Sequence, residues 1–109
     1  MIRFYSEHTI NIGVPCSDIE LKSVVPCTRE NEAVAFACGV QLGGGNPLVF
    51  MQNSGLGNCL DTLTTLYYPY GFDFEWHIWN RKDLHHSLMG EVAPKIARLI
   101  HNEAKRSNT

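Results

Sequence analysis

Short apolar runs separated by polar or glycine-rich segments recur along the chain. Residues 8–14 alternate apolar and polar positions in the manner of a strand and stop at Pro15, and Ser23–Cys27 is a second, β-branched run. Pro47–Met51 is apolar throughout, as in a parallel strand that is covered on both faces, and Glu75–Asn80 follows as a fourth candidate. The pattern therefore predicts four short strands.

Segments of helical character fall between and after these strands. A capping-box pattern at Ser17–Glu20 opens a short helix. The Ala-rich segment after Thr28 is typical of a buried helix that ends at Gly43–Gly45, and residues 58–66 form the next helix. From Glu91 onward apolar residues recur on one helical face, and basic residues toward the C-terminal half oppose the helix dipole. This alternation predicts an open, mostly parallel α/β sheet.

Composition and charge narrow the classes of function. At 109 residues, of which 44% are apolar, the chain has material for one core, and one domain is the default. The formal charge of −2 is spread without a basic stripe or an acidic tail, which indicates neither a nucleic acid nor an acidic partner. No apolar run approaches the roughly 18 residues of a membrane span, and no export signal is recognisable. We therefore expect a cytoplasmic protein without a membrane segment.

The cysteines and histidines show no spacing typical of a metal site. Cys16, Cys27, Cys38 and Cys59 are even in number, but without an export signal we expect reduced thiols rather than disulfide bonds. The sequence has no C-x-x-C pair and no H-E-x-x-H motif, and the adjacent pair His85–His86 is more typical of a solvated turn. We expect no metal site in this chain.

Ligands of open α/β sheets bind outside the carboxyl ends of the strands, where residues 13–17, 28–30 and 52–57 of this chain are expected. The segment 52–57 is not a Walker A loop, because it lacks Gly-Lys-Ser/Thr, nor a dinucleotide fingerprint, because Leu60 replaces the third small residue. Its glycines allow close backbone approach, and its Gln, Asn and Ser suit a polar heterocycle. The alternative is a tight turn whose Asn and Ser only cap the next helix.

Glu30 lies at a predicted strand-to-helix junction and also admits two interpretations. A carboxylate in the first turn of a helix is commonly just a favourable contact with the helix dipole, with Glu32 on the solvated side. Alternatively, the apolar residues 33–40 that follow Glu30 indicate a poorly solvated cleft, in which a carboxyl group keeps and shares a proton more readily.

Several motifs of the chain correspond to those of a known enzyme family. The octet Met51–Asn58 (MQNSGLGN) is long and uncommon, and it lies at a family-like distance after Thr28–Glu30. The chain thereby resembles the pyrimidine-binding domain of thiamine-diphosphate-dependent decarboxylases, in particular the family of sulfopyruvate decarboxylase alpha subunits and phosphonopyruvate decarboxylases. The resemblance extends from about Ile12 to Ile100, and its further motifs are Asn31–Ala33, Leu42–Gly44, Val14–Ser17, Trp79–Leu84 and Leu88–Gly90.

The resemblance implies a three-layer fold, an open and mostly parallel sheet with helices on both faces, formed by a single pyrimidine-binding domain over residues 1–109. The chain departs from the family in length. Its first strand begins within roughly ten residues of Met1, where the family has a helix, and the connection 15–22 is shorter than the 10–12 residues usual for a crossover. A second shortening follows Leu66. We therefore expect a domain that is shortened at its N-terminus and internally.

The resemblance also implies a mechanism and a set of site residues. Glu30 would hydrogen-bond N1′ of the cofactor's aminopyrimidine and promote removal of the thiazolium proton, so that the ylid attacks a 2-oxo acid and carbon dioxide leaves. Arg81 would bind the anionic tail of the substrate, although a surface residue beside Asp83 is the alternative. The implied cofactor contacts are Pro15, Glu30, Gln52, Asn53 and Gly55, and the implied substrate contacts are Cys16, Ser17, Asn53, Ser54 and Arg81.

The chain lacks the Gly-Asp-Gly motif with which the family binds Mg²⁺ and the diphosphate. The resemblance therefore implies a beta-type partner subunit that holds Mg²⁺ and shares the thiamine diphosphate, with sulfopyruvate or phosphonopyruvate as the anionic substrate. Two other hypotheses stay open. The chain is a truncated, inactive homologue that acts only in assembly or regulation, or it is a free-standing flavodoxin-like binding module.

Overall fold

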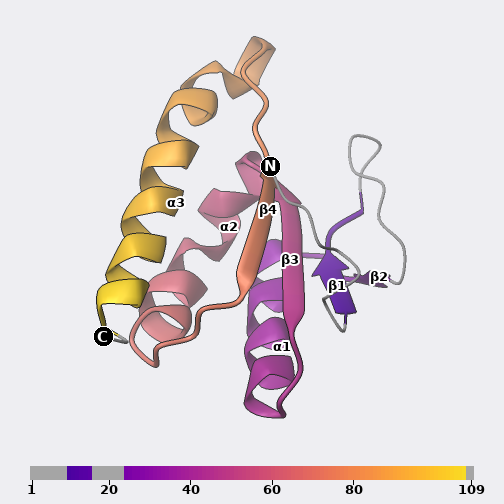
Figure 1. Ribbon diagram of the computed structural model, residues 1–109. Coiled ribbons are helices and arrows are strands. Elements are labelled where there is room, and N and C mark those ends of the chain that lie inside the picture. The colour runs from indigo at the N-terminus through magenta and orange to yellow at the C-terminus, as the bar shows by residue number, and fades with distance from the viewer. Residues whose placement is uncertain (1–9, 16–23, 108–109) are drawn as a thin grey trace.

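The computed structural model describes residues 10–15 and 24–107, and strands and helices alternate from residue 24 onward (Figure 1). Predicted strands and helices are found at each place where the described residues allow a comparison. The helix expected to open at Ser17 lies outside the described residues. In chain order the elements are β1 (Ile10–Gly13), β2 (Val24–Pro26), α1 (Glu30–Leu42), β3 (Pro47–Gln52), α2 (Ser54–Thr62), a π-helical turn (Leu63–Tyr67), β4 (Glu75–Trp79), a 3₁₀ turn (Leu84–His86) and α3 (Ser87–Ser107).

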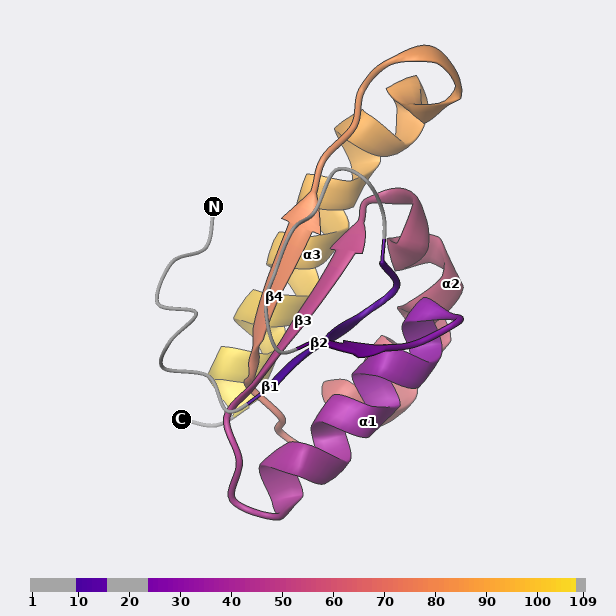
Figure 2. The ribbon, with the colours of Figure 1, turned by 90° about the vertical axis from the view of Figure 1, so that its right-hand side faces the viewer.

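The four strands form one parallel sheet in the order β2-β1-β3-β4. Figures 1 and 2 show α1 and α2 on one side of this sheet and α3 beside its β4 edge, and α2 lies between the other two helices. Along β3, Val49 and Met51 face the helices, whereas Leu48 and Phe50 face the other way, and all four are buried. The central strand is therefore covered on both faces. The predicted α/β class with a parallel sheet is confirmed, and the arrangement is compatible with a shortened three-layer fold.

The core lies between the sheet and the helices. α1 contributes small side chains, among them Ala33 and Ala37, which let the helix approach the sheet closely. Tyr67 fills the space under the end of α2, with its ring 4.9 Å from that of Phe74 and 5.0 Å from that of Trp76. Its hydroxyl donates to the carbonyl oxygen of Phe74 at 3.2 Å, so the buried polar atom is paired.

Two helix boundaries differ from the prediction. α2 begins at Ser54 rather than at residue 58, because β3 continues to Gln52 and the single residue Asn53 connects strand to helix. The two glycines predicted in a loop therefore belong to the helix. α3 begins at Ser87 rather than at Glu91.

α3 also continues through Pro94, which has no backbone N–H to donate to the carbonyl of Gly90. That carbonyl accepts a hydrogen bond from Nδ2 of Asn80 at 3.0 Å instead. The side chain of Asn80 thus replaces the missing helical hydrogen bond and ties the start of α3 to the residue that follows β4. No helix within residues 10–15 and 24–107 is long and apolar enough to cross a membrane.

Candidate functional site

All four strands run in the same direction, so their carboxyl ends meet at one edge of the sheet. Pro15 follows β1 at this edge and is exposed, Glu30 begins α1 after β2, Asn53 follows β3 and Arg81 follows β4. The expected convergence of the three loop segments is confirmed for the residues that the structure describes. Cys16 and Ser17 lie outside those residues, and their predicted contacts with substrate stay predictions.

The side chain of Glu30 crosses from α1 to α2. Glu30 lies on the same stripe of α1 as the buried residues Val34 and Ala37, at spacings of four and seven. A Cβ atom added to Gly55 would lie 2.6 Å from Cδ and 2.7 Å from Oε2 of Glu30. Asn58, one turn further along α2, donates from Nδ2 to Oε1 of Glu30 at 3.1 Å. The half-buried carboxyl group therefore occupies the space that a glycine leaves on α2.

The second acidic residue of this turn, Glu32, has a different role. Its Oε1 accepts hydrogen bonds from the Thr28 hydroxyl at 2.7 Å and from the backbone N–H groups of Arg29 at 3.0 Å and Thr28 at 3.2 Å. These donors, the Thr28 hydroxyl first among them, lower the pKa of the Glu32 carboxyl. Glu32 is exposed, as predicted, and caps the helix. Glu30 is thus more than a contact with the helix dipole.

Asn53 is completely buried and ties the exits of β3 and β4 together. Its Nδ2 donates to Oδ1 of Asn80 at 2.9 Å and to the carbonyl oxygen of Arg81 at 2.7 Å, and its backbone N–H donates to the carbonyl of Trp79 at 3.0 Å. Its side chain does not cap α2, so the interpretation of Asn53 as a helix cap is wrong. Oδ1 of Asn53 is buried and has no hydrogen-bond partner among the described residues.

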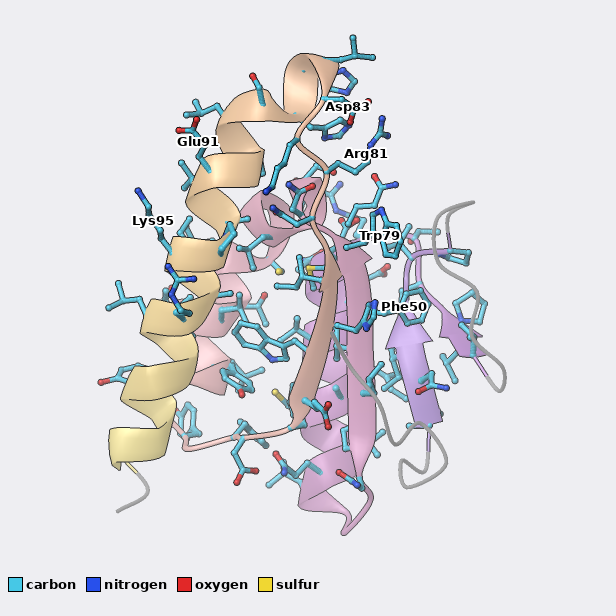
Figure 3. The ribbon with its side chains drawn as sticks, turned by 45° about the horizontal axis from the view of Figure 1, so that its top comes forward. Phe50, Trp79, Arg81, Asp83, Glu91 and Lys95 are labelled. Carbon is cyan, nitrogen blue, oxygen red and sulfur yellow. The ribbon has the colours of Figure 1, made fainter. Side chains whose placement is uncertain are left out.

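Arg81 and Asp83 form a surface ion pair beyond the end of β4 (Figure 3). Nε of Arg81 lies 3.3 Å from Oδ1 of Asp83, and Nη2 lies 3.0 Å from Oδ2. This bidentate contact lowers the pKa of the Asp83 carboxyl. The pairing with Asp83, considered above as the alternative, is thus present, and binding of a substrate anion by Arg81 stays a prediction.

Comparison with known proteins identifies relatives along most of the chain. No protein-family model matches it. The alpha subunit of sulfopyruvate decarboxylase from Methanocaldococcus jannaschii is 30% identical over 90 residues, which cover 73% of this chain and 53% of that protein. The corresponding subunit from Methanococcus maripaludis is 34% identical over 90 residues, covering 73% and 54%. Phosphonopyruvate decarboxylase from Streptomyces viridochromogenes is 45% identical over 67 residues, covering 52% of this chain and 17% of that protein.

The resemblance to sulfopyruvate and phosphonopyruvate decarboxylases is confirmed. The chain spans about half the length of the sulfopyruvate decarboxylase alpha subunits that it matches.

Among the residues that the resemblance to these decarboxylases singles out, the structure brings two pairs into contact. Glu30 and Gly55 are in direct contact, whereas Asn53 contacts the backbone of Arg81 on the β4 side. The others lie at the same edge without a described contact to Glu30: Pro15 after β1, Gln52 at the end of β3 and the exposed Ser54 at the start of α2.

Two residues of the site, Asn58 and Asn80, were not among those predicted. Asn58 lies within the octet that carries the resemblance to the decarboxylases, and it follows Gly55 by three residues, which places both on one face of a helix. That signal requires α2 to begin at Ser54. Asn80 is revealed only by the packing of α3 against the end of β4. Among the side chains that the structure describes, in residues 10–15 and 24–100, no three His, Cys, Asp or Glu cluster in a way that could hold a metal ion.

Proposed function

We propose that the chain is the pyrimidine-binding subunit of a two-component, thiamine-diphosphate-dependent decarboxylase that acts on a short anionic 2-oxo acid, sulfopyruvate or phosphonopyruvate. Relatives with these names support the reaction class. The observation that carries the proposal is the position of the Glu30 carboxyl, which lies in the space left by Gly55 at the carboxyl edge of the sheet. A polar group of an enzyme stabilises a ligand most strongly when the fold already holds it in the position that the reaction requires.

The residues at this edge fit an aminopyrimidine ring. Such a ring needs a carboxyl partner for its nitrogen and an acceptor for its amino hydrogens. Glu30, whose carboxyl group lies against Gly55, supplies the first, and the buried Oδ1 of Asn53 is an acceptor that has no partner among the described residues. We therefore assign the pyrimidine to these residues, with Pro15 and Gln52 beside them.

When bound, thiamine diphosphate supplies the electron sink that decarboxylation of a 2-oxo acid requires. This chain contributes the groups around it. Glu30 holds and exchanges one proton at its carboxyl group, and the packing of α1 against α2 fixes where that carboxyl lies. The guanidinium group of Arg81 is planar and can form paired hydrogen bonds with a sulfonate or phosphonate group once it releases Asp83.

We assign the diphosphate and Mg²⁺ to a beta-type partner. The relatives are named alpha subunits, and this sequence contains no Gly-Asp-Gly motif. The active site would then lie between the two chains, in the cytoplasm, and neither chain would decarboxylate alone.

The test is reconstitution. The chain is co-expressed with a beta-type subunit that carries Gly-Asp-Gly, and release of carbon dioxide from sulfopyruvate and phosphonopyruvate is measured with and without thiamine diphosphate and Mg²⁺. We expect turnover of one substrate that requires both subunits and both additions. A stable complex that binds the coenzyme without any turnover would favour the inactive homologue, and coenzyme uptake by this chain alone would favour the free-standing module.

A further inference from the structure

Asn58 lies in the middle of α2, and helix propensity does not explain why an asparagine is found there. Asparagine is a poor helix former in a helix interior, because its side chain competes for the backbone hydrogen bonds. Asn58 is exposed, and its backbone belongs to the regular helix Ser54–Thr62. Its side-chain amide points across to α1 and donates to Oε1 of Glu30 at 3.1 Å. The side chain of Asn58 therefore serves to hydrogen-bond the carboxyl group of Glu30.

This hydrogen bond distinguishes the two oxygens of Glu30. A protonated carboxyl group has one oxygen that only accepts and one that carries the hydrogen. Because Nδ2 of Asn58 donates to Oε1, Oε1 is the accepting oxygen and the hydrogen belongs on Oε2. Oε2 lies against Gly55 and has no hydrogen-bond partner among the described residues. In a protonated Glu30, the oxygen that carries the hydrogen is thus the one that Asn58 leaves without a hydrogen bond.

The donor is also neutral. An arginine or lysine in the place of Asn58 would hold Glu30 in its ionised form, whereas an amide orients the carboxyl without a full charge. No ion pair to Glu30 occurs in the described part of the chain. The nearby thiol of Cys59 is buried, and burial together with the charge of Glu30 raises the pKa of Cys59 to about 12, so this neighbour is uncharged at neutral pH as well.

We propose that Asn58 is a positioning residue for Glu30: its amide occupies Oε1 and so presents Oε2 as the oxygen that exchanges a proton with the ligand. The proposal rests on the proposed function of Glu30 and extends it to a residue that does not itself touch the coenzyme. It explains why an asparagine, rather than a better helix former, stands three residues after Gly55.

The first test is made on the chain alone and does not depend on activity. The side-chain NH₂ signals of Asn58 are recorded in ¹⁵N-labelled protein. We expect them to shift in Glu30→Gln, because the substitution replaces the carboxyl oxygen that accepts the hydrogen bond of Asn58 by a group of a carboxamide, and to stay in place in Glu32→Gln, whose carboxyl belongs to the cap on the other side of the helix. Signals that do not respond to Glu30→Gln would overturn the proposed contact.

The second test uses the reconstituted complex. Asn58→Ala removes the donor, and Asn58→Asp keeps the shape but has no N–H, so we expect both to lower kcat by about 10-fold to 100-fold while KM for the 2-oxo acid changes little. Asp61→Ala, a change of another exposed polar residue on α2, is the matched control and should keep both constants. Denaturant midpoints close to that of the original chain would exclude misfolding as the cause.

The outcomes separate this inference from the function on which it rests. If the original complex turns over and Asn58→Asp retains its kcat, the positioning role is wrong while the decarboxylase proposal stands. If the original complex is inactive with every substrate but the Asn58 signals respond to Glu30→Gln, the hydrogen bond is correct and the proposed function is wrong.

Discussion

The two faces of the first turn of α1 hold carboxyl groups only two residues apart, yet their surroundings differ. On the outer face, Glu32 accepts three hydrogen bonds from Thr28 and Arg29 and is exposed. On the inner face, Glu30 reaches over Gly55 and accepts one hydrogen bond, from the neutral amide of Asn58. Both residues lie near the positive end of the helix dipole. The two carboxyl groups therefore differ because their side chains point to different sides of the helix, although the residues are close in sequence.

The difference shows how one turn can cap a helix with one carboxyl group and direct the other toward the edge of the sheet. Glu32 satisfies backbone N–H groups that the helix start would otherwise leave unpaired. Its pKa is lowered, so it is held in the ionised form and has little capacity left for a ligand. Glu30 is not needed for the cap and keeps an oxygen without a partner among the described residues. The cap thus leaves Glu30 available to a ligand.

The largest expected effect is a loss of turnover when Glu30, but not Glu32, is substituted. In the reconstituted complex, Glu30→Gln should lower kcat at least about 100-fold, because an amide of the same shape cannot exchange the proton. Glu32→Gln should leave kcat nearly unchanged. Steady-state kinetics of the two variants measure this difference in kcat. Equal effects of the two substitutions would contradict the separate roles of Glu30 and Glu32.

The next effect concerns the glycine that makes room for Glu30. Gly55→Ala places a methyl group 2.6 Å from Cδ of Glu30, so the carboxyl must move. We expect turnover to fall about 100-fold and the free energy of unfolding to decrease by about 1–3 kcal/mol. Kinetics and urea unfolding measure the two quantities.

Gly57→Ala is the matched control on the same helix, because its added methyl group would meet only Cε of Met89, at 3.7 Å. The gain in helix propensity should stabilise this variant by up to about 1 kcal/mol without a change in turnover. If both alanine variants behaved alike, the contact between Glu30 and Gly55 would not matter for function.

A smaller effect concerns the residue that fixes where α2 begins. Asn53→Ala removes the donor to Asn80 and Arg81 and leaves both part-buried acceptors short of a partner, which should cost about 1–3 kcal/mol in urea unfolding. The neighbouring exposed substitution Ser54→Ala should change the free energy of unfolding by less than about 0.5 kcal/mol. A cost for Asn53→Ala as small as that for Ser54→Ala would show that β3 and β4 do not depend on this link.

The smallest effect is the pH dependence of the helix cap. The pKa of Glu32 is lowered from its ordinary value of 4.5, so its contribution to stability is present above pH 4.5 and is lost as the pH falls through the native-state pKa. We expect Glu32→Gln to lower the free energy of unfolding at pH 7 and to flatten its decrease below pH 4.5. Denaturant titrations at several pH values measure this slope, and an unchanged slope would contradict the capping role.

Local pattern predicted much of the fold but not its junctions. The strands were predictable because each is a short apolar run, and the Arg81–Asp83 pair because its members are two residues apart. The start of α2 was not, because a turn of one residue, Asn53, carries no distinct signal and glycines are usually found in loops.

The site was predictable only in part for a related reason. Glu30 and Gly55 follow from the resemblance, but their contact depends on how α1 packs against α2, and so does the role of Asn58. The bond from Asn80 to Gly90 depends on a proline inside α3, at a place where sequence rules disfavour one. Contacts of this kind join residues far apart in the chain, and no local pattern encodes them.

The most direct test of the central claim is a crystal structure of the reconstituted complex with thiamine diphosphate. We expect Oε2 of Glu30 within hydrogen-bond distance of the pyrimidine nitrogen, below about 3.2 Å, with Oε1 still bound by Asn58. A pyrimidine ring seated away from α1 and α2, or a Glu30 carboxyl turned into bulk solvent, would contradict the account.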